Sequence, residues 1–131
     1  MDIKDMLTKY RTVAVVGLSP DAGKPSHEVA AYLKRAGYRI VPVNPSCQEV
    51  LGERCYPTLA DVPGEVEIVD VFRRSEFLPE IVEQAVAKGA KVVWMQEGVV
   101  NEEAAKRARE AGLEVVMDRC MLKEHIRAVS R

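Results

Sequence analysis

The segment TVAVVGLSPDAGKPSHEVAAYLKRAGYRIVPVN, residues 12–44, decides the fold of this chain. It contains two short apolar runs rich in valine, residues 12–17 and 38–44, separated by a loop and a helical pattern over 26–37. Nearly unbroken apolar runs of this length are typical of strands that are covered on both faces. Gly37 closes the helical pattern, where a helix end favours a left-handed residue. The segment therefore predicts a strand, a loop, a helix and a second strand.

The same alternation continues along the rest of the chain. Further strands are expected at 65–72, 91–96 and 113–117, further helices at 76–89, 101–112 and 120–130, and one short helical turn at 58–62. Gly89 and Gly112 close two of these helices. Strands and helices that alternate with right-handed crossovers form a parallel sheet with helices on both faces. The sequence thus predicts an α/β fold, a Rossmann-like three-layer domain with a five-stranded parallel sheet, and a single domain over residues 1–131.

The composition of the 131 residues argues against several kinds of partner. Its 19 Lys and Arg against 20 Asp and Glu give a formal net charge of -1, without the electrostatic footprint of a protein that binds nucleic acid or a membrane surface. No apolar run reaches the roughly 18 residues of a membrane span. The charged stretch at 1–11 lacks the apolar core of a signal peptide. We expect a cytoplasmic protein with no nucleic-acid or membrane partner.

The cysteines Cys47, Cys55 and Cys120 are odd in number and have no C-x-x-C spacing. This pattern argues against a disulfide framework and against a zinc site, so free thiols are expected. Cys47 lies two residues after Pro45 in a loop that we expect to be exposed. A thiol there could form a mixed disulfide with a thiol ligand if its pKa were lowered.

The loop at 17–26 departs from the phosphate-binding loop of nucleoside triphosphatases, G-x-x-x-x-G-K followed by Ser or Thr. Five residues separate Gly17 from Gly23, and Lys24 is followed by Pro25. Proline supplies neither the backbone N–H that cradles phosphate nor the hydroxyl that holds magnesium. The sequence therefore argues against triphosphatase chemistry and predicts no metal site.

The loop also departs from the dinucleotide fingerprint G-x-G-x-x-G. Ser19 and Ala22 stand where the second and third glycines belong. The second strand ends in Asn44 and Pro45, where a NAD site has an acid that binds the ribose hydroxyls. A nicotinamide-dependent oxidoreductase is thus an alternative, but these residues do not favour it.

A general anion site remains compatible with the loop. Gly17 lets the backbone approach a phosphate, Ser19 and Ser26 can donate hydroxyl hydrogens, and the helix N-terminus adds partial positive charge. Pro25 suits the first turn of that helix, and Lys24 supplies a point charge. The competing interpretation is that Gly17 forms only a tight turn and that Lys24 is a solvated surface residue.

Three separated stretches resemble a known family. VAVVGLSPDAGKPSHEVAAYLKRAGYRIVPVNP, VDVFRRSE and KVVWMQEGVVNEEAAKRAREAGLEVVMDRC together look like the small stand-alone CoA-binding proteins. The fold of these proteins is similar to that of the CoA-binding domain of the succinyl-CoA synthetase alpha subunit. The similarity extends from about residue 13 to residue 126, and its motifs recur in order.

The resemblance implies coenzyme A or a short acyl-CoA as the ligand. The residues that it implies as ligand contacts lie at four strand ends: Gly17, Leu18, Ser19, Pro20, Lys24, Ser26, Val43, Asn44, Pro45, Ser46, Val71, Phe72, Arg73 and Gln96. The first loop would face the pyrophosphate and the segment 43–46 would border the adenosine. Arg73 could reach a phosphate, and Gln96 would lie toward the pantetheine arm.

The resemblance transfers binding and not ligase chemistry. The phosphorylated histidine of the synthetase belongs to a second domain, catalysis there also needs a beta subunit, and neither His27 nor His125 inherits that role. We therefore expect a CoA-binding protein without catalytic residues of its own, which is a possible homo-oligomer or has a partner protein. The alternatives are the oxidoreductase and a protein-interaction module with an empty crevice.

Six side chains have individual roles that the sequence suggests. Trp94 lies inside an apolar strand and is expected in the core, whereas Phe72 could either stack on adenine or close the core. Asp118 follows the last strand and is expected to cap the closing helix, although it could instead brace the crevice. His125 is expected to be a surface or packing residue. Of the adjacent arginines Arg73 and Arg74, we expect one to bind phosphate and the other to be solvated; the alternative is that both are solvated.

Overall fold

The computed structural model describes residues 1–130 and confirms the predicted alternation of strands and helices. In chain order the elements are α1 (Ile3–Lys9), β1 (Thr12–Val16), α2 (Pro25–Arg35), β2 (Arg39–Val43), β3 (Glu49–Val50), β4 (Glu53–Arg54), the 3-10 turn η1 (Leu59–Asp61), β5 (Ile68–Val71), the 3-10 turn η2 (Ser75–Phe77), α3 (Leu78–Lys88), β6 (Val92–Met95), α4 (Glu102–Glu110), β7 (Glu114–Val116) and α5 (Met121–Val129).

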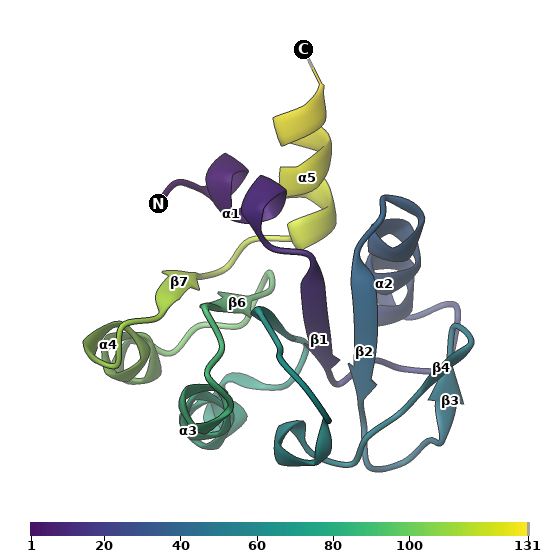
Figure 1. Cartoon of the computed structure of the whole chain (residues 1–131), viewed down its shortest axis with the longest axis horizontal. Coiled ribbons are helices and arrows are strands. Elements are labelled where there is room, and N and C mark those ends of the chain that lie inside the picture. The colour runs from purple at the N-terminus through teal and green to yellow at the C-terminus, as the bar shows by residue number, and fades with distance from the viewer. Residues whose placement is uncertain (131) are drawn as a thin grey trace.

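Five parallel strands form the main sheet, in the order β2-β1-β5-β6-β7. The chain passes from β1 outward to the edge strand β2 and then returns to the other side of β1 to form β5 (Figure 1). The strand order therefore reverses between β1 and β5. Ligand crevices of open α/β sheets lie outside the carboxyl ends of the strands at such a reversal.

Helices cover both faces of the sheet, which makes the fold the expected Rossmann-like α/β architecture. Helices α1, α2 and α5 pack on one face, and α3, α4 and η1 pack on the other (Figure 1). Neighbouring side chains of β1 alternate between these layers: Val13 and Val15 belong to the first, and Ala14 and Val16 to the second. Both faces are apolar because both are buried, as the unbroken valine runs predict.

The predicted helix ends are confirmed by the backbone. Gly37, Gly89 and Gly112 have φ angles of 105°, 78° and 92°, in the left-handed region that glycine adopts at low cost. The short turn expected at 58–62 is also present, as η1.

The sequence analysis did not predict α1 or the hairpin formed by β3 and β4. Helix α1 buries only Met6 and Leu7, so its apolar pattern is too short to recognise. The strands of the hairpin contain two residues each. Strand β5 also starts at Ile68 instead of at 65, and the carboxylate of Glu67 just before it accepts from the N–H groups of Arg11 and Thr12 at the start of β1, at 2.8 and 3.0 Å.

No helix in residues 1–130 is long and apolar enough to cross a membrane.

Candidate functional site

The crevice begins where β1 and β5 end. Gly17 follows β1 with a φ of 90°, and its N–H donates to the Val43 carbonyl oxygen at 2.8 Å. A Cβ atom at this position would lie 3.0 Å from the Phe72 carbonyl oxygen and 3.0 Å from Cδ of Arg73. Only glycine fits both the backbone angle and this close approach. Gly17 therefore lets the loop after β1 lie directly against the loop after β5.

The loop after Gly17 is held by its own polar side chains. The Ser19 N–H donates to Oγ of Ser26 at 3.0 Å, and Oγ of Ser19 accepts from the Asp21 N–H at 3.0 Å. The Asp21 carboxylate in turn accepts from the Gly23 N–H at 2.9 Å. A hydroxyl that accepts in this way retains its own hydrogen as a donor. The loop thus combines a defined backbone with two hydroxyl groups suited to an anion.

Helix α2 starts at this loop, with Lys24 at the cap position and Pro25 in the first turn. Its N-terminus adds the partial positive charge of the unpaired N–H groups. A cavity of about 300 Å³ lies here, lined by Gly17, Ser19, Lys24, Pro25, Ser26 and Phe72. The expected anion-site residues are therefore brought together around one cavity.

Asn44 joins the end of β2 to the same loop. Its Nδ2 donates to the Leu18 carbonyl oxygen at 2.8 Å, and its Oδ1 accepts from the Ser46 N–H at 2.8 Å. A carboxylate could not make the first of these bonds because it has no hydrogen to donate at neutral pH. This geometry explains why an amide stands where a NAD site has an acid.

Two further cavities continue the crevice on either side. The cavity on the β2 side has a volume of about 270 Å³ and is lined by Val16, Val43, Pro45, Pro57, Thr58, Arg73, Phe77, Glu80, Ile81 and Gln84. The cavity on the β6 side has a volume of about 300 Å³ and is lined by Pro25, Val29, Phe72, Gln96, Glu97, Val99 and Cys120. Pro25 and Phe72 border both the central cavity and the β6-side cavity, so these two are continuous along the carboxyl edge of the sheet. The β2-side cavity shares no lining residue with them and is lined instead by Val16 and Arg73, the chain neighbours of Gly17 and Phe72.

The structure separates the adjacent arginines Arg73 and Arg74. The Arg73 guanidinium carbon lies 4.4 Å from the ring centroid of Phe77, and Arg73 lines the β2-side cavity. Arg74 lies farther from the same ring, at 5.9 Å, and is exposed. Stacking on an aromatic face orients a guanidinium while leaving its N–H groups available for an anion. Arg73 is therefore the better placed of the two to bind a phosphate.

A buried polar pair lies at the inner end of the crevice. Nε2 of Gln96 donates to Oδ1 of Asp70 at 2.5 Å, and both side chains are almost entirely buried. Oδ2 of Asp70 has no hydrogen-bond partner among the described residues. Burial raises the pKa of the Asp70 carboxyl to about 7, although the bond from Gln96 acts in the opposite direction. The sequence analysis missed Asp70, although an acid inside the apolar strand IVDV was a usable signal.

The other predicted contacts fall into two groups. The side chains of Leu18, Val43 and Val71 are buried in the core, which leaves chiefly their backbone to face the crevice. Pro20 and the segment 45–46 are exposed at its rim. Contact of these residues with a ligand stays a prediction.

Trp94 and His125 lie where the sequence analysis expected them. Trp94 is completely buried, and its Nε1 donates to the Arg119 carbonyl oxygen at 2.8 Å. His125 packs edge-on against two tyrosine rings, Tyr32 and Tyr38, and its Nδ1 lies 2.6 Å from the Tyr32 hydroxyl. Both packing assignments are confirmed.

The expectation that Asp118 caps the closing helix is wrong. Cys120 occupies the cap position of α5. Asp118 instead has a φ of 59°, and its carboxylate accepts from the Gly98 N–H at 2.7 Å. It braces the loop after β6, because that loop and the end of β7 meet at the same edge of the sheet.

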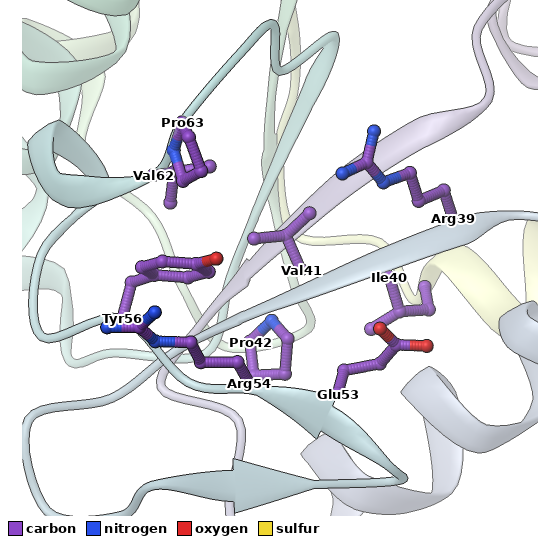
Figure 2. A pocket seen from close by; sticks show the side chains of 9 residues that line it. All are labelled: Arg39, Ile40, Val41, Pro42, Glu53, Arg54, Tyr56, Val62 and Pro63. Atoms are coloured by element: carbon purple, nitrogen blue, oxygen red, sulfur yellow. The ribbon is translucent and has the colours of Figure 1, made fainter.

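A separate small cavity lies outside the crevice, on the outer edge of β2. It has a volume of about 90 Å³ and is lined by Arg39, Ile40, Val41, Pro42, Glu53, Arg54, Tyr56, Val62 and Pro63 (Figure 2). Figure 2 shows the Arg54 guanidinium beside the Tyr56 ring, and the guanidinium carbon lies 5.2 Å from the ring centroid. This volume is well below the several hundred Å³ of a typical cofactor pocket. Residues 1–130 contain no cluster of His, Cys, Asp and Glu that could hold a metal ion.

Comparison with known proteins identifies the family of this chain. The family model of the CoA binding domain matches residues 11–126. The chain belongs to this family. The CoA-binding domain family supports coenzyme A as the general class of ligand, and the Rossmann-like fold agrees with the solved structures that the chain resembles.

Three relatives illustrate the range of the family. The chain is 43% identical over 124 residues to the uncharacterized protein YneT of Bacillus subtilis, and this alignment covers 95% of this chain and 92% of YneT. It is 32% identical over 109 residues to the ADP-forming acetate–CoA ligase II of Archaeoglobus fulgidus, covering 82% of this chain but 16% of the ligase. A hypothetical protein from Pyrococcus horikoshii has a similar solved structure, with a TM-score of 0.96, 47% identity, and coverage of 98% of this chain and 91% of that one. The chain thus matches small relatives over nearly their full length, and a small part of a ligase.

Proposed function

We propose that the crevice binds coenzyme A or a short acyl-CoA, with the pyrophosphate at the loop after β1. The observation that carries this proposal is the central cavity at the strand-order reversal, lined by Ser19, Lys24 and Ser26 at the N-terminus of α2. A pyrophosphate is a compact dianion that suits hydroxyl donors, a lysine and a helix N-terminus. Because the net charge of the chain is only -1, the anion must be held by these local groups.

The flanking cavities support an extended orientation of the ligand. The β2-side cavity, with Arg73 and the Phe77 ring, suits the adenosine and its phosphate. The β6-side cavity suits the pantetheine arm, which would cross Phe72 and end toward Gln96. Because Nε2 of Gln96 already donates to Asp70, the amide oxygen of Gln96 is the group left to accept from an amide of the pantetheine.

We further propose that this chain binds its ligand without transforming it, as a single domain in the cytoplasm. Neither histidine lines one of the three cavities: Nδ1 of His27 lies 3.0 Å from the Ser19 carbonyl oxygen, and His125 packs between tyrosines. The match to YneT over 92% of that protein's length also supports a binding module. Chemistry on a thioester would then come from a partner protein, and the chain would act as a carrier, a sensor or part of an assembly.

Calorimetric titration with coenzyme A tests the proposal, with Arg73→Ala and Arg74→Ala as a matched pair. Loss of a charge-assisted hydrogen bond to a phosphate weakens binding by about tenfold to hundredfold. We expect this loss for Arg73→Ala and a change of less than about twofold for Arg74→Ala, whose side chain is exposed and farther from the Phe77 ring.

Parallel titrations with NAD and ATP separate the alternatives. Binding of NAD without binding of coenzyme A would overturn the proposal in favour of the oxidoreductase. Binding of none of the three would leave the protein-interaction module as the better hypothesis.

A further inference from the structure

Two cysteines meet at the base of the hairpin formed by β3 and β4. The hairpin pairs Glu49 with Arg54, and the Cys55 N–H donates to the Gln48 carbonyl oxygen at 2.8 Å just below that pair. Sγ of Cys47 lies 2.9 Å from Sγ of Cys55. The sequence alone does not indicate that these thiols meet, because the hairpin that reverses the chain between them has strands of only two residues.

The two thiols have unequal access to solvent. Cys47 is half-buried, whereas Cys55 is only 6% exposed. Burial raises the pKa of the Cys55 thiol to about 12, and the hydrogen bond with Cys47 adds to this effect. A reagent in solution therefore reacts first with Cys47, while the buried Cys55 remains a protonated thiol.

We propose that Cys47 and Cys55 form a thiol–disulfide exchange site that is oxidised by small-molecule disulfides. The Cys47 thiolate attacks one sulfur of the disulfide RSSR, which forms a Cys47–SR bond and releases RS⁻. Cys55 then loses its proton to solvent and attacks Sγ of Cys47, which forms the Cys47–Cys55 disulfide and releases the second RS⁻. The two cysteines are oxidised together by two electrons, and RSSR is reduced to two molecules of thiol.

The geometry of the hairpin base suits this second step. A disulfide bond is about 2.05 Å long, so the sulfurs need to approach by about 0.9 Å from their present separation. The backbone bond between Gln48 and Cys55 already holds the two chain segments side by side. Closure therefore needs only a side-chain adjustment in a short loop, and a mixed disulfide on Cys47 places its reactive sulfur beside Cys55.

The exchange site is linked by backbone bonds to the crevice. Tyr56 follows Cys55, its N–H donates to the Pro42 carbonyl oxygen at 3.0 Å, and its carbonyl oxygen accepts from the Asn44 N–H at 2.9 Å. Asn44 in turn holds the carbonyl of Leu18 in the phosphate loop. Oxidation would therefore restrain the segment between Asn44 and Cys47 that borders the crevice, and we expect it to tighten coenzyme A binding a few-fold by preorganisation. This consequence rests on the proposed function, whereas the exchange site itself does not.

The test uses oxidised glutathione as the probe, followed by alkylation of the remaining thiols, intact mass measurement and peptide mapping. We expect the wild-type chain to lose about 2 Da through a Cys47–Cys55 link while Cys120 is alkylated, and dithiothreitol to reverse the change. The pKa of Cys55 is about 12, so between pH 7 and pH 9 its thiolate fraction rises about tenfold per pH unit. Formation of the disulfide should therefore accelerate steeply over this range. Alkylation of both Cys47 and Cys55 after oxidation would overturn the proposal.

Single variants test the order of attack. Cys55→Ser should retain one glutathione on Cys47, because no second thiol is present to displace it. Cys47→Ser should leave Cys55 at least about tenfold less reactive toward glutathione than Cys47 is in Cys55→Ser. Cys120→Ser is the control and should form the link as the wild type does. Equal reactivity of Cys47 and Cys55 in these variants would contradict the assigned order.

Coenzyme A titration of the reduced and the oxidised wild type distinguishes the two proposals. If the Cys47–Cys55 disulfide forms but neither the reduced nor the oxidised protein binds coenzyme A, the proposed function is refuted and the exchange site is supported. Equal affinity of the two forms refutes the coupling between them.

Discussion

Gly17 and Gly37 show how the surroundings of a residue, and not its backbone angle alone, make a glycine indispensable. Both have positive φ angles, 90° and 105°. A Cβ atom would meet nothing within 4 Å at Gly37, but at Gly17 it would lie 3.0 Å from a backbone carbonyl oxygen. The first glycine therefore allows two loops to approach, whereas the second allows only a helix to end.

The variants Gly17→Ala and Gly37→Ala isolate this difference. We expect Gly37→Ala to cost about 1 kcal/mol through the left-handed backbone alone, and Gly17→Ala to cost about 2–4 kcal/mol because a steric clash is added. Only Gly17→Ala should also weaken coenzyme A binding. Urea unfolding followed by the fluorescence of Trp94, the single tryptophan, measures the free energy of unfolding. Equal costs at the two positions would show that the contact of Gly17 with the loop after β5 does not affect stability.

Helix α5 is the element whose packing depends on a titratable side chain. His125 packs against Tyr32 of α2 and against Tyr38, and the Tyr38 hydroxyl donates to the Leu7 carbonyl oxygen of α1 at 2.5 Å. Burial lowers the pKa of His125, and the nearby Arg11 guanidinium lowers it further. The docked helix therefore favours the neutral imidazole.

We expect acid to loosen α5. As pH falls, His125 takes up a proton near the usual histidine pKa in the unfolded chain but only at a lower pH in the folded chain. The contribution of neutral His125 to the free energy of unfolding is therefore present at neutral pH and is lost as pH falls through its lowered pKa. His125→Gln keeps a partner for the Tyr32 hydroxyl without titrating, so the amides of α5 should lose less hydrogen-exchange protection between pH 7 and pH 5 than in the wild type. His27→Gln, at the only other histidine, should respond as the wild type does.

Asp70 affects the stability of the whole molecule because it lies in the middle strand of the sheet, between β1 and β6. It is completely buried, with one oxygen bonded to Gln96 and the other unpaired among the described residues. Its pKa of about 7 lies above the usual value of 3.8. Between these two values the unfolded chain has lost the proton and the folded chain retains it, so stability falls as pH rises from about 4 to 7 and is constant above that range.

The variant Asp70→Asn should remove this dependence. An asparagine oxygen can still accept from Gln96, and the amide does not ionise. We expect the variant to be more stable than the wild type at pH 8, by at most about 4 kcal/mol, and to differ little from it at pH 4. Unfolding in urea at both pH values measures the effect, with Glu65→Gln as the exposed control. If the free energy of unfolding of Asp70→Asn changed between pH 4 and pH 8 as much as that of the wild type does, this role of Asp70 would be ruled out.

The arrangement of the whole molecule could be predicted largely because it rests on local patterns. Valine runs of strand length and helices that end in Gly37, Gly89 and Gly112 indicate the parallel sheet, and the rule that ligands bind at the carboxyl ends of strands indicates the edge. The loop at 17–26 was likewise excluded as a triphosphatase loop from its own residues. The hairpin was missed because strands of two residues have no periodicity to detect.

The amino-acid sequence by itself determined the order of strands and helices, the positions of the helix ends and the loops that form the crevice, because each depends on residues that are neighbours in the chain. Only the tertiary structure decided that Gln96 bonds to Asp70, that Asp118 bonds to the loop after β6, and that Cys47 meets Cys55. The register of a sheet or hairpin sets such pairs, and one residue of slip would turn each side chain to the opposite face. Periodicity along a chain states which side chains are buried, but the partner of a buried polar group depends on how distant segments are aligned.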